Sequence, residues 1–136
     1  MSRSGYSDSC DSWESIMWRG AVSSAIRGKR GQAFLKEMLA ALDKLPEKRL
    51  IAGEFMDSAG EVCALGAVGK ARNCEIKEVN IEDNEGAGEL FGIARAMAAE
   101  IQSINDDDFS YRKETPEERF VRVRKWVVEQ IKGAAA

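Results

Sequence analysis

One segment, residues 62–71, constrains the fold more than any other part of the chain. Nearly all of its residues are small or apolar, and two of them, Gly66 and Gly69, are glycines. A glycine inside a helix costs about 1 kcal/mol relative to alanine. Two glycines so close together indicate that other elements pack very near to this backbone. The segment therefore predicts a short central helix that longer helices enclose.

The composition predicts one soluble domain. Of 136 residues, 44% are hydrophobic and 32% are charged, and this length suits a single core better than two. No apolar run approaches the roughly 20 residues that a membrane span needs, and the N-terminus lacks the apolar stretch of a signal peptide. We therefore expect a cytoplasmic domain at residues 12–132, between a flexible N-terminus at 1–11 and a frayed tail at 133–136.

Helical periodicity predicts the elements around the central helix. Apolar positions recur at helical spacing in four further segments: 12–27, 32–45, 87–104 and 116–132. Thr115 and Glu118 give the last segment a capping box, with Pro116 at the first helical position. Asn73 is expected to cap the central helix at its C-terminal end.

A minor β-hairpin is expected between the second helix and the central helix. Residues 50–52 have the composition of a short strand, residues 57–60 that of a turn, and residues 61–63 are placed to pair back. The predicted fold is therefore mainly α. It is a compact bundle of four to five helices around a short central helix of small residues, with one minor β-hairpin.

The residue types argue against common catalytic chemistry. The chain has no histidine, which is the commonest general base and metal ligand. Its three cysteines show neither the spacing of a disulfide framework nor that of a zinc site. Cys63, near a predicted helix N-terminus, is either a reactive thiol or, as we prefer, one more small core residue. We expect no enzymatic activity, no metal and no cofactor.

The basic turn at residues 27–31 is the best candidate for binding. Its glycines free the backbone, and the helix that follows can bind anions through its exposed N–H groups. Arg27, Lys29 and Arg30 add positive charge, and Trp18 offers a stacking surface. The turn is not a phosphate-binding Walker loop, since the six-residue framework and the Lys-Ser/Thr ending are missing.

The alternative interpretation of this turn is structural. Its cations would then only pair with the acidic connection at residues 75–89, as charged turns often do. A net charge of −3 also argues against a dedicated DNA-binding protein. The acidic triplet at residues 106–108 is expected to be a solvated loop, because the glycine of a calcium-binding loop is absent.

Four motifs carry a resemblance to a known group of proteins. They are GKRGQAFL at the basic turn, EVCALGAVGKA at the central helix, Ile104-Asn105-Asp106, and TPEERFVRVRKWV at the last helix. Over residues 13–131 the chain resembles small uncharacterised proteins of phage and prophage genomes. The resemblance implies an accessory protein that is made in a bacterium during phage infection or lysogeny, and it supplies no catalytic residue.

The expected function is that of a non-enzymatic, phage-type accessory protein. Its expected partner is a host or phage macromolecule, and inhibition of a host defence system is one expected effect; its oligomeric state is left open. The expected contact residues are Trp18, Arg27, Lys29 and Arg30. The alternative is a nucleic-acid or phosphate-binding module that uses the turn at residues 27–31.

Overall fold

The structure of the protein is a computed structural model, which describes residues 5–73, 84–106 and 114–135. Within these ranges it has six helices. They are α1 (Gly5–Arg27), α2 (Lys29–Lys44), α3 (Ala64–Arg72), α4 (Asn84–Phe91), α5 (Arg95–Asp106) and α6 (Pro116–Ala135). In the ranges described, no helix is both long enough and apolar enough to cross a membrane.

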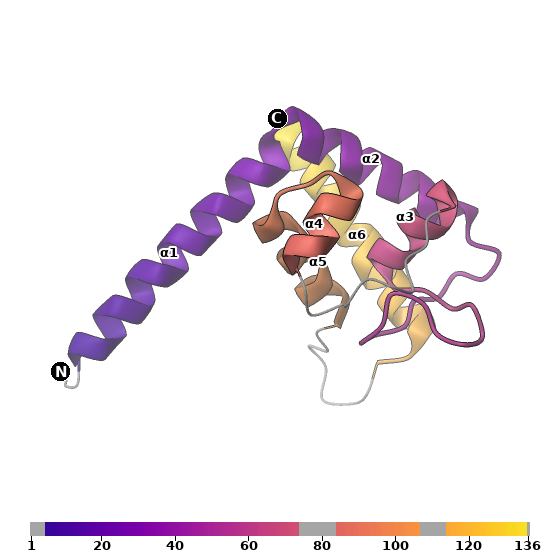
Figure 1. Cartoon of the computed structure of the whole chain (residues 1–136), viewed down its shortest axis with the longest axis horizontal. Helices are drawn as coiled ribbons and strands as arrows, with labels where there is room; N and C mark the ends of the chain where they lie inside the picture. Colours follow the sequence, from indigo (N-terminus) through magenta and orange to yellow (C-terminus); the bar gives the residue numbers. More distant parts are fainter. Residues whose placement is uncertain (1–4, 74–83, 107–113, 136) are drawn as a thin grey trace.

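The helices form a compact body from which one helix projects. In the body, α2 packs against α3 and α6, while α4 packs against α5. The C-terminal part of α1 lies against α5 and α2, and its N-terminal half runs away from the other helices as an arm (Figure 1). The prediction of a mainly helical fold is confirmed.

The central helix α3 is as enclosed as its small residues predict. All of residues 64–69 are buried. A Cβ atom added at Gly66 would lie 1.9 Å from the backbone carbonyl oxygen of Phe55, so only glycine fits there. Asn73 ends the helix in the left-handed conformation, at φ 62° and ψ 41°, which confirms the predicted C-cap.

The core lies between α3 and the two longer helices of the body. From α2, Leu35, Met38 and Leu42 are fully buried, and Val123 and Val127 of α6 are buried with them. Complete burial of a large aliphatic side chain contributes about 1.5–3 kcal/mol. The apolar face of α2 therefore fixes α3 and α6 on the same core.

The predicted β-hairpin is wrong. Between α2 and α3 the described chain has one isolated antiparallel bridge, between Met56 and Val62, and no strand. The predicted turn does form, since the carboxylate of Asp57 accepts two backbone N–H groups at 2.9 Å. However, Gly53 has a φ of +84° and interrupts the extended run before Phe55 enters the core. The pairing segments are therefore too short for a ladder.

Three helix boundaries differ from the prediction. Helix α1 begins at Gly5, within the segment 1–11 that was expected to be flexible, and α6 continues into the tail at 133–136. The single helix expected over 87–104 is two helices, α4 and α5. Gly92 has a φ of +73°, a conformation that ends α4, and a short connection leads into α5.

Asn105 joins three separate segments of the chain inside the body. Its side-chain oxygen accepts the N–H of Ala64 at 3.0 Å, and its amide nitrogen donates to the carbonyl of Ile51 at 2.9 Å. Its own carbonyl accepts from Nε of Arg119 at 2.8 Å. The side chain is 1% exposed. Buried polar groups need such partners, so Asn105 has a structural role here.

The start of α6 confirms the predicted capping box. The Thr115 hydroxyl accepts the N–H of Glu118 at 3.1 Å, and the Glu118 carboxylate accepts the N–H of Thr115 at 2.9 Å. One turn later, Arg122 donates to the carbonyl of Ile104 and pairs with Glu114 at 2.7 Å. The first turns of α6 therefore also cap the C-terminal end of α5.

Candidate binding surface

A tight elbow joins α1 to α2 at the basic turn. Gly28 is its connecting residue, and Gln32 donates from its side chain to the carbonyl of Ile26 at 2.8 Å. A Cβ atom at Gly31 would lie 2.0 Å from the carbonyl oxygen of Ala25. The start of α2 is thus packed directly on the last turn of α1. The glycines serve this close packing, and α2 begins at Lys29, earlier than the sequence predicts.

The three cations of the predicted site are exposed at this elbow. Arg27, Lys29 and Arg30 form no ion pair within the described ranges. Several arginines elsewhere are held by carboxylates; Arg124, for example, pairs with Asp43 at 2.8 Å and lowers the pKa of that carboxyl group. As far as the described residues show, the elbow cations can therefore pair with a partner, whereas Arg124 is already held by Asp43.

The elbow cations line two separate hollows. Arg27 borders a cleft between α1, α5 and α6, with a volume of about 210 Å³. Lys29 and Arg30 border a hollow of about 270 Å³ against Ile93 and Met97. The structure thus brings the three cations to one elbow but divides them between its two sides.

Trp18 lies away from the basic turn. It precedes Arg27 by nine residues, which is about 13 Å along a helix and half a turn around it. The two residues therefore occupy opposite sides of α1. Trp18 is 41% exposed and follows two more exposed apolar residues, Ile16 and Met17. The predicted stacking surface and the predicted cations do not form one continuous site.

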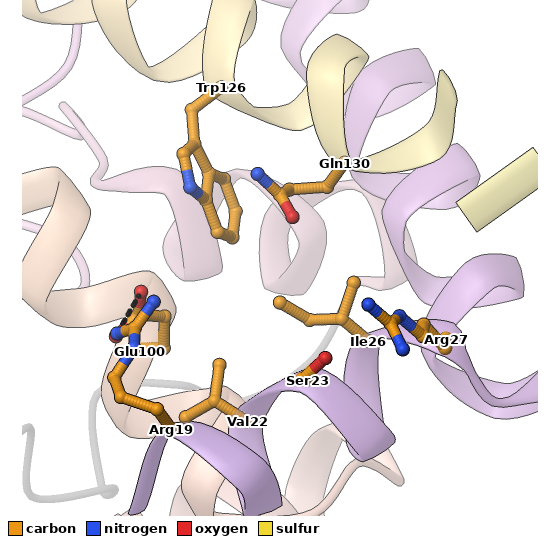
Figure 2. Close-up of a pocket in the computed structure, with 8 residues that line it drawn as sticks. All are labelled: Arg19, Val22, Ser23, Ile26, Arg27, Glu100, Trp126 and Gln130. Atoms are coloured by element: carbon orange, nitrogen blue, oxygen red, sulfur yellow. Dashed lines mark hydrogen bonds and ion pairs between the residues drawn. The ribbon is translucent and has the colours of Figure 1, made fainter. Parts of the chain in front are cut away.

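The α1–α5–α6 cleft combines a charged end with a polar, aromatic wall (Figure 2). At the charged end, Nη1 of Arg19 donates to both carboxylate oxygens of Glu100, at 3.2 and 3.1 Å. On the opposite wall, Trp126 and Gln130 of α6 project towards α1. The cleft has the hydrogen-bonding groups and the partly buried aromatic ring to hold a side chain of a partner.

Sequence reasoning did not identify the residues that α5 and α6 contribute to this cleft. Glu100 lies among apolar residues of α5, next to the buried Ile101. This position is the one feature of the sequence that could have identified Glu100 as part of the cleft. A carboxylate beside an apolar stripe needs a cation, which Arg19 supplies from α1. For Trp126 and Gln130, helical spacing alone does not distinguish a cleft wall from a half-buried surface.

Cys63 is a core residue and not a reactive thiol. It is buried, and its sulfur accepts the N–H of Gly66 at 3.4 Å at the start of α3. Burial raises the pKa of the Cys63 thiol to about 12, which outweighs the backbone N–H groups that favour a thiolate. The thiol is therefore protonated at neutral pH, as the preferred interpretation of the sequence requires.

The acidic segments offer no cation site in the part of the chain that the structure covers. Among the residues described, no group of three or more His, Cys, Asp or Glu side chains is placed to hold a metal ion. Asp106 instead accepts from the N–H of Gly53 at 3.3 Å and from the Asn105 amide at 2.9 Å. The predictions for residues 75–83 and 107–108 lie outside the described residues.

No protein-family model matches the chain, and no curated protein or solved structure matches it either.

Proposed function

We propose that this protein is a non-enzymatic binding protein whose α1–α2 elbow holds an acidic surface of a partner protein. The observation that carries this proposal is the elbow itself: Arg27, Lys29 and Arg30 are exposed there without an ion pair to any described residue. Because no ion pair with a described residue has to be broken, the partner's carboxylates can pair with these cations directly. Positive charge on both sides of the elbow also steers an acidic partner towards it.

The close packing of the elbow supports a specific contact. Gly31 lies against the backbone of α1, so the three cations are carried on a backbone that is fixed before binding. Preorganised groups lose less conformational entropy when a complex forms. Trp18 stays a predicted contact, at a second point along α1.

The resemblance to phage and prophage proteins supplies the biological context of the proposal. In that context the partner is a host or phage protein, and inhibition of a host defence system is one effect that such binding would have. The buried, protonated Cys63 weighs against the enzymatic alternative that a reactive thiol would have offered.

A pull-down with a charge-deleted variant tests the proposal. The tagged protein and its Arg27→Ala/Lys29→Ala/Arg30→Ala variant are incubated with nuclease-treated bacterial lysate. A Lys36→Ala/Lys125→Ala variant, which removes exposed cations elsewhere, serves as the control. We expect one stoichiometric protein to bind the wild type and the control and to be lost from the triple variant, with thermal stability unchanged. Retention of that protein by the triple variant would refute the site.

A phosphate or nucleic-acid ligand is the second candidate, and one observation favours it. Gly28, the N-cap of α2, makes no side-chain capping hydrogen bond, and the first turn of α2 has no acidic residue, so an anion would be favoured at this positive end of the helix dipole. Fluorescence anisotropy with short DNA and RNA at two salt concentrations tests this function. Binding that weakens steeply with salt would support it, and absent or salt-insensitive binding would remove it.

A further inference from the structure

The α1–α5–α6 cleft has the size of a site for one small group. Its volume is about 210 Å³, below the roughly 300–1,000 Å³ of the pockets that hold drug-sized molecules. One side of it is apolar, since it is lined by Val22 and Ile26 of α1, which are 2% and 6% exposed. A group the size of one amino-acid residue therefore fits the cleft, and its apolar part can pack on these two side chains.

Several polar side chains around the cleft have unused hydrogen-bonding capacity. Ser23, Trp126 and Gln130 lie around the same small space (Figure 2). All three are partly buried, yet none makes a side-chain hydrogen bond within the ranges that the structure describes. Polar groups that are withdrawn from water usually have a partner. Three groups that the described fold does not use thus converge on one cleft.

Arg19 keeps part of its hydrogen-bonding capacity in spite of its pair with Glu100. Both bonds of the pair leave from one atom, Nη1, at 3.2 and 3.1 Å, and an arginine has five N–H donors. Nε and Nη2 of Arg19 donate to no described residue. Because Glu100 is only 9% exposed, it holds the guanidinium at the cleft that Arg19 lines. The remaining donors are therefore in place before a ligand binds.

The charge of the lining favours a singly charged anion. Its charged residues are two cations, Arg19 and Arg27, and one carboxylate, that of Glu100. Arginine and the indole of tryptophan are donors only, and the carboxylate already accepts from Arg19, so the cleft mainly requires an acceptor. A carboxylate matches one surplus positive charge, whereas a phosphate group carries about −1.5 to −2.

We infer that the α1–α5–α6 cleft binds a carboxylate on a small apolar body, from a free carboxylic acid or from the last residue of a partner chain. The carboxylate accepts from Arg19, and the apolar body packs between Ile26 and the ring of Trp126. Gln130 bonds to a further polar atom of the ligand. Lys29 and Arg30 line the other hollow, so this site does not depend on the acidic contact proposed for the elbow.

NMR titration of the isotope-labelled protein tests the inference. The probes are N-acetyl-leucine, which has a carboxylate on an apolar residue, and its neutral amide, N-acetyl-leucinamide. The readout is the indole N–H signal of Trp126, identified by its loss in Trp126→Phe, and the signal of Trp18 is the internal control. We expect N-acetyl-leucine to shift the Trp126 signal saturably and the amide to bind about tenfold more weakly or worse. No shift, or equal binding of acid and amide, would overturn the inference.

A third probe, isovalerate, distinguishes the two sources of the carboxylate. It is a free acid without a peptide group. If isovalerate binds as tightly as N-acetyl-leucine, the peptide group adds nothing and the cleft is a site for a free acid. If N-acetyl-leucine binds more tightly, the peptide group makes its own contacts and the cleft is a site for the end of a chain.

Matched arginine variants test the role of Arg19. Arg19→Gln should weaken the binding of N-acetyl-leucine by about tenfold or more. The control Arg124→Gln breaks a different arginine–carboxylate pair, with Asp43, and should bind as the wild type does. If Arg19→Gln alone does not fold, Arg19→Gln/Glu100→Gln replaces it, because that variant leaves no carboxylate without its cation. Full affinity in the Arg19 variant would overturn the inference.

A variant of the elbow separates this site from the proposed function. Lys29→Ala/Arg30→Ala removes the two cations of the other hollow and leaves every residue that lines the cleft unchanged. We expect it to bind N-acetyl-leucine as the wild type does while its binding of the elbow partner is weakened. The cleft and the elbow contact can therefore fail independently, and loss of N-acetyl-leucine binding in this variant would contradict the assignment to the cleft.

Discussion

Replacing Asn105 with alanine should destabilise the body more than any change to its surface. The substitution removes the acceptor of the Ala64 N–H and the donor to the Ile51 carbonyl, which lie 3.0 and 2.9 Å from the amide. Both backbone groups then lose their partner, the Ala64 N–H in a buried position and the Ile51 carbonyl in a partly buried one. The substitution therefore removes two hydrogen bonds and also leaves a backbone N–H and a backbone carbonyl without a partner.

The magnitude follows from the number of groups left without a partner. Each buried, unsatisfied polar group costs about 1–3 kcal/mol. Two such groups give a loss of about 3 kcal/mol in the free energy of unfolding, or roughly a hundredfold in the folding equilibrium. With a urea dependence of about 2 kcal/mol per molar, the unfolding midpoint should fall by about 1.5 M.

Urea unfolding followed by far-ultraviolet circular dichroism measures this change. The control is Lys125→Ala, an exposed residue of α6, which should stay within about 0.5 kcal/mol of the wild type. Asn105→Asp adds a second comparison, because aspartate keeps the acceptor for Ala64 and loses the donor to Ile51. A loss below about 1 kcal/mol in Asn105→Ala would show that the two backbone groups find other partners and would refute the reasoning.

Three further changes test other parts of the fold. Gly66→Ala should cost about 3 kcal/mol in thermal unfolding, since its Cβ would overlap the Phe55 carbonyl; unchanged stability would mean that this contact is looser than the structure shows. Thr115→Ala should lose about 1 kcal/mol and Thr115→Ser much less, an order that equal losses would contradict. Because burial raises the pKa of Cys63 from 9.0 to about 12, its contribution to stability should be complete below pH 9 and be lost between pH 9 and 12. In denaturation at high pH, Cys63→Ala should not show this loss of stability between pH 9 and 12. A loss of equal size in both proteins would count against the burial of Cys63.

The helical fold could be predicted from the sequence because its main signals are local. The apolar spacing of α2, the capping box of Thr115 and Glu118, and the small residues of α3 each specify an element without reference to distant residues. The hairpin could not be predicted correctly, because Gly53 acts through a backbone conformation that the local composition does not specify. The same reason explains the break at Gly92.

The candidate site was only partly predictable because it depends on tertiary packing. The basic composition of the turn identified Arg27, Lys29 and Arg30, but their division between two sides of the elbow follows from the way α2 packs on α1. The pairing of Arg19 with Glu100 spans 81 positions in the sequence. Such a pair has no signal in the local sequence of either partner.

The positions of the partners of Asn105 in the sequence set the order in which its hydrogen bonds can form during synthesis. Its side-chain partners, Ala64 and Ile51, precede it in sequence, so they have already been made when Asn105 is added. Its carbonyl has a later donor in Arg122, 17 positions further on, and a nearer donor in Arg119, 14 positions further on. At about 5–20 residues per second, a growing chain waits on the order of a second for that donor. Until then the last turn of α5 carries an open carbonyl, and the body should become fully resistant to proteases only once α6 has been made.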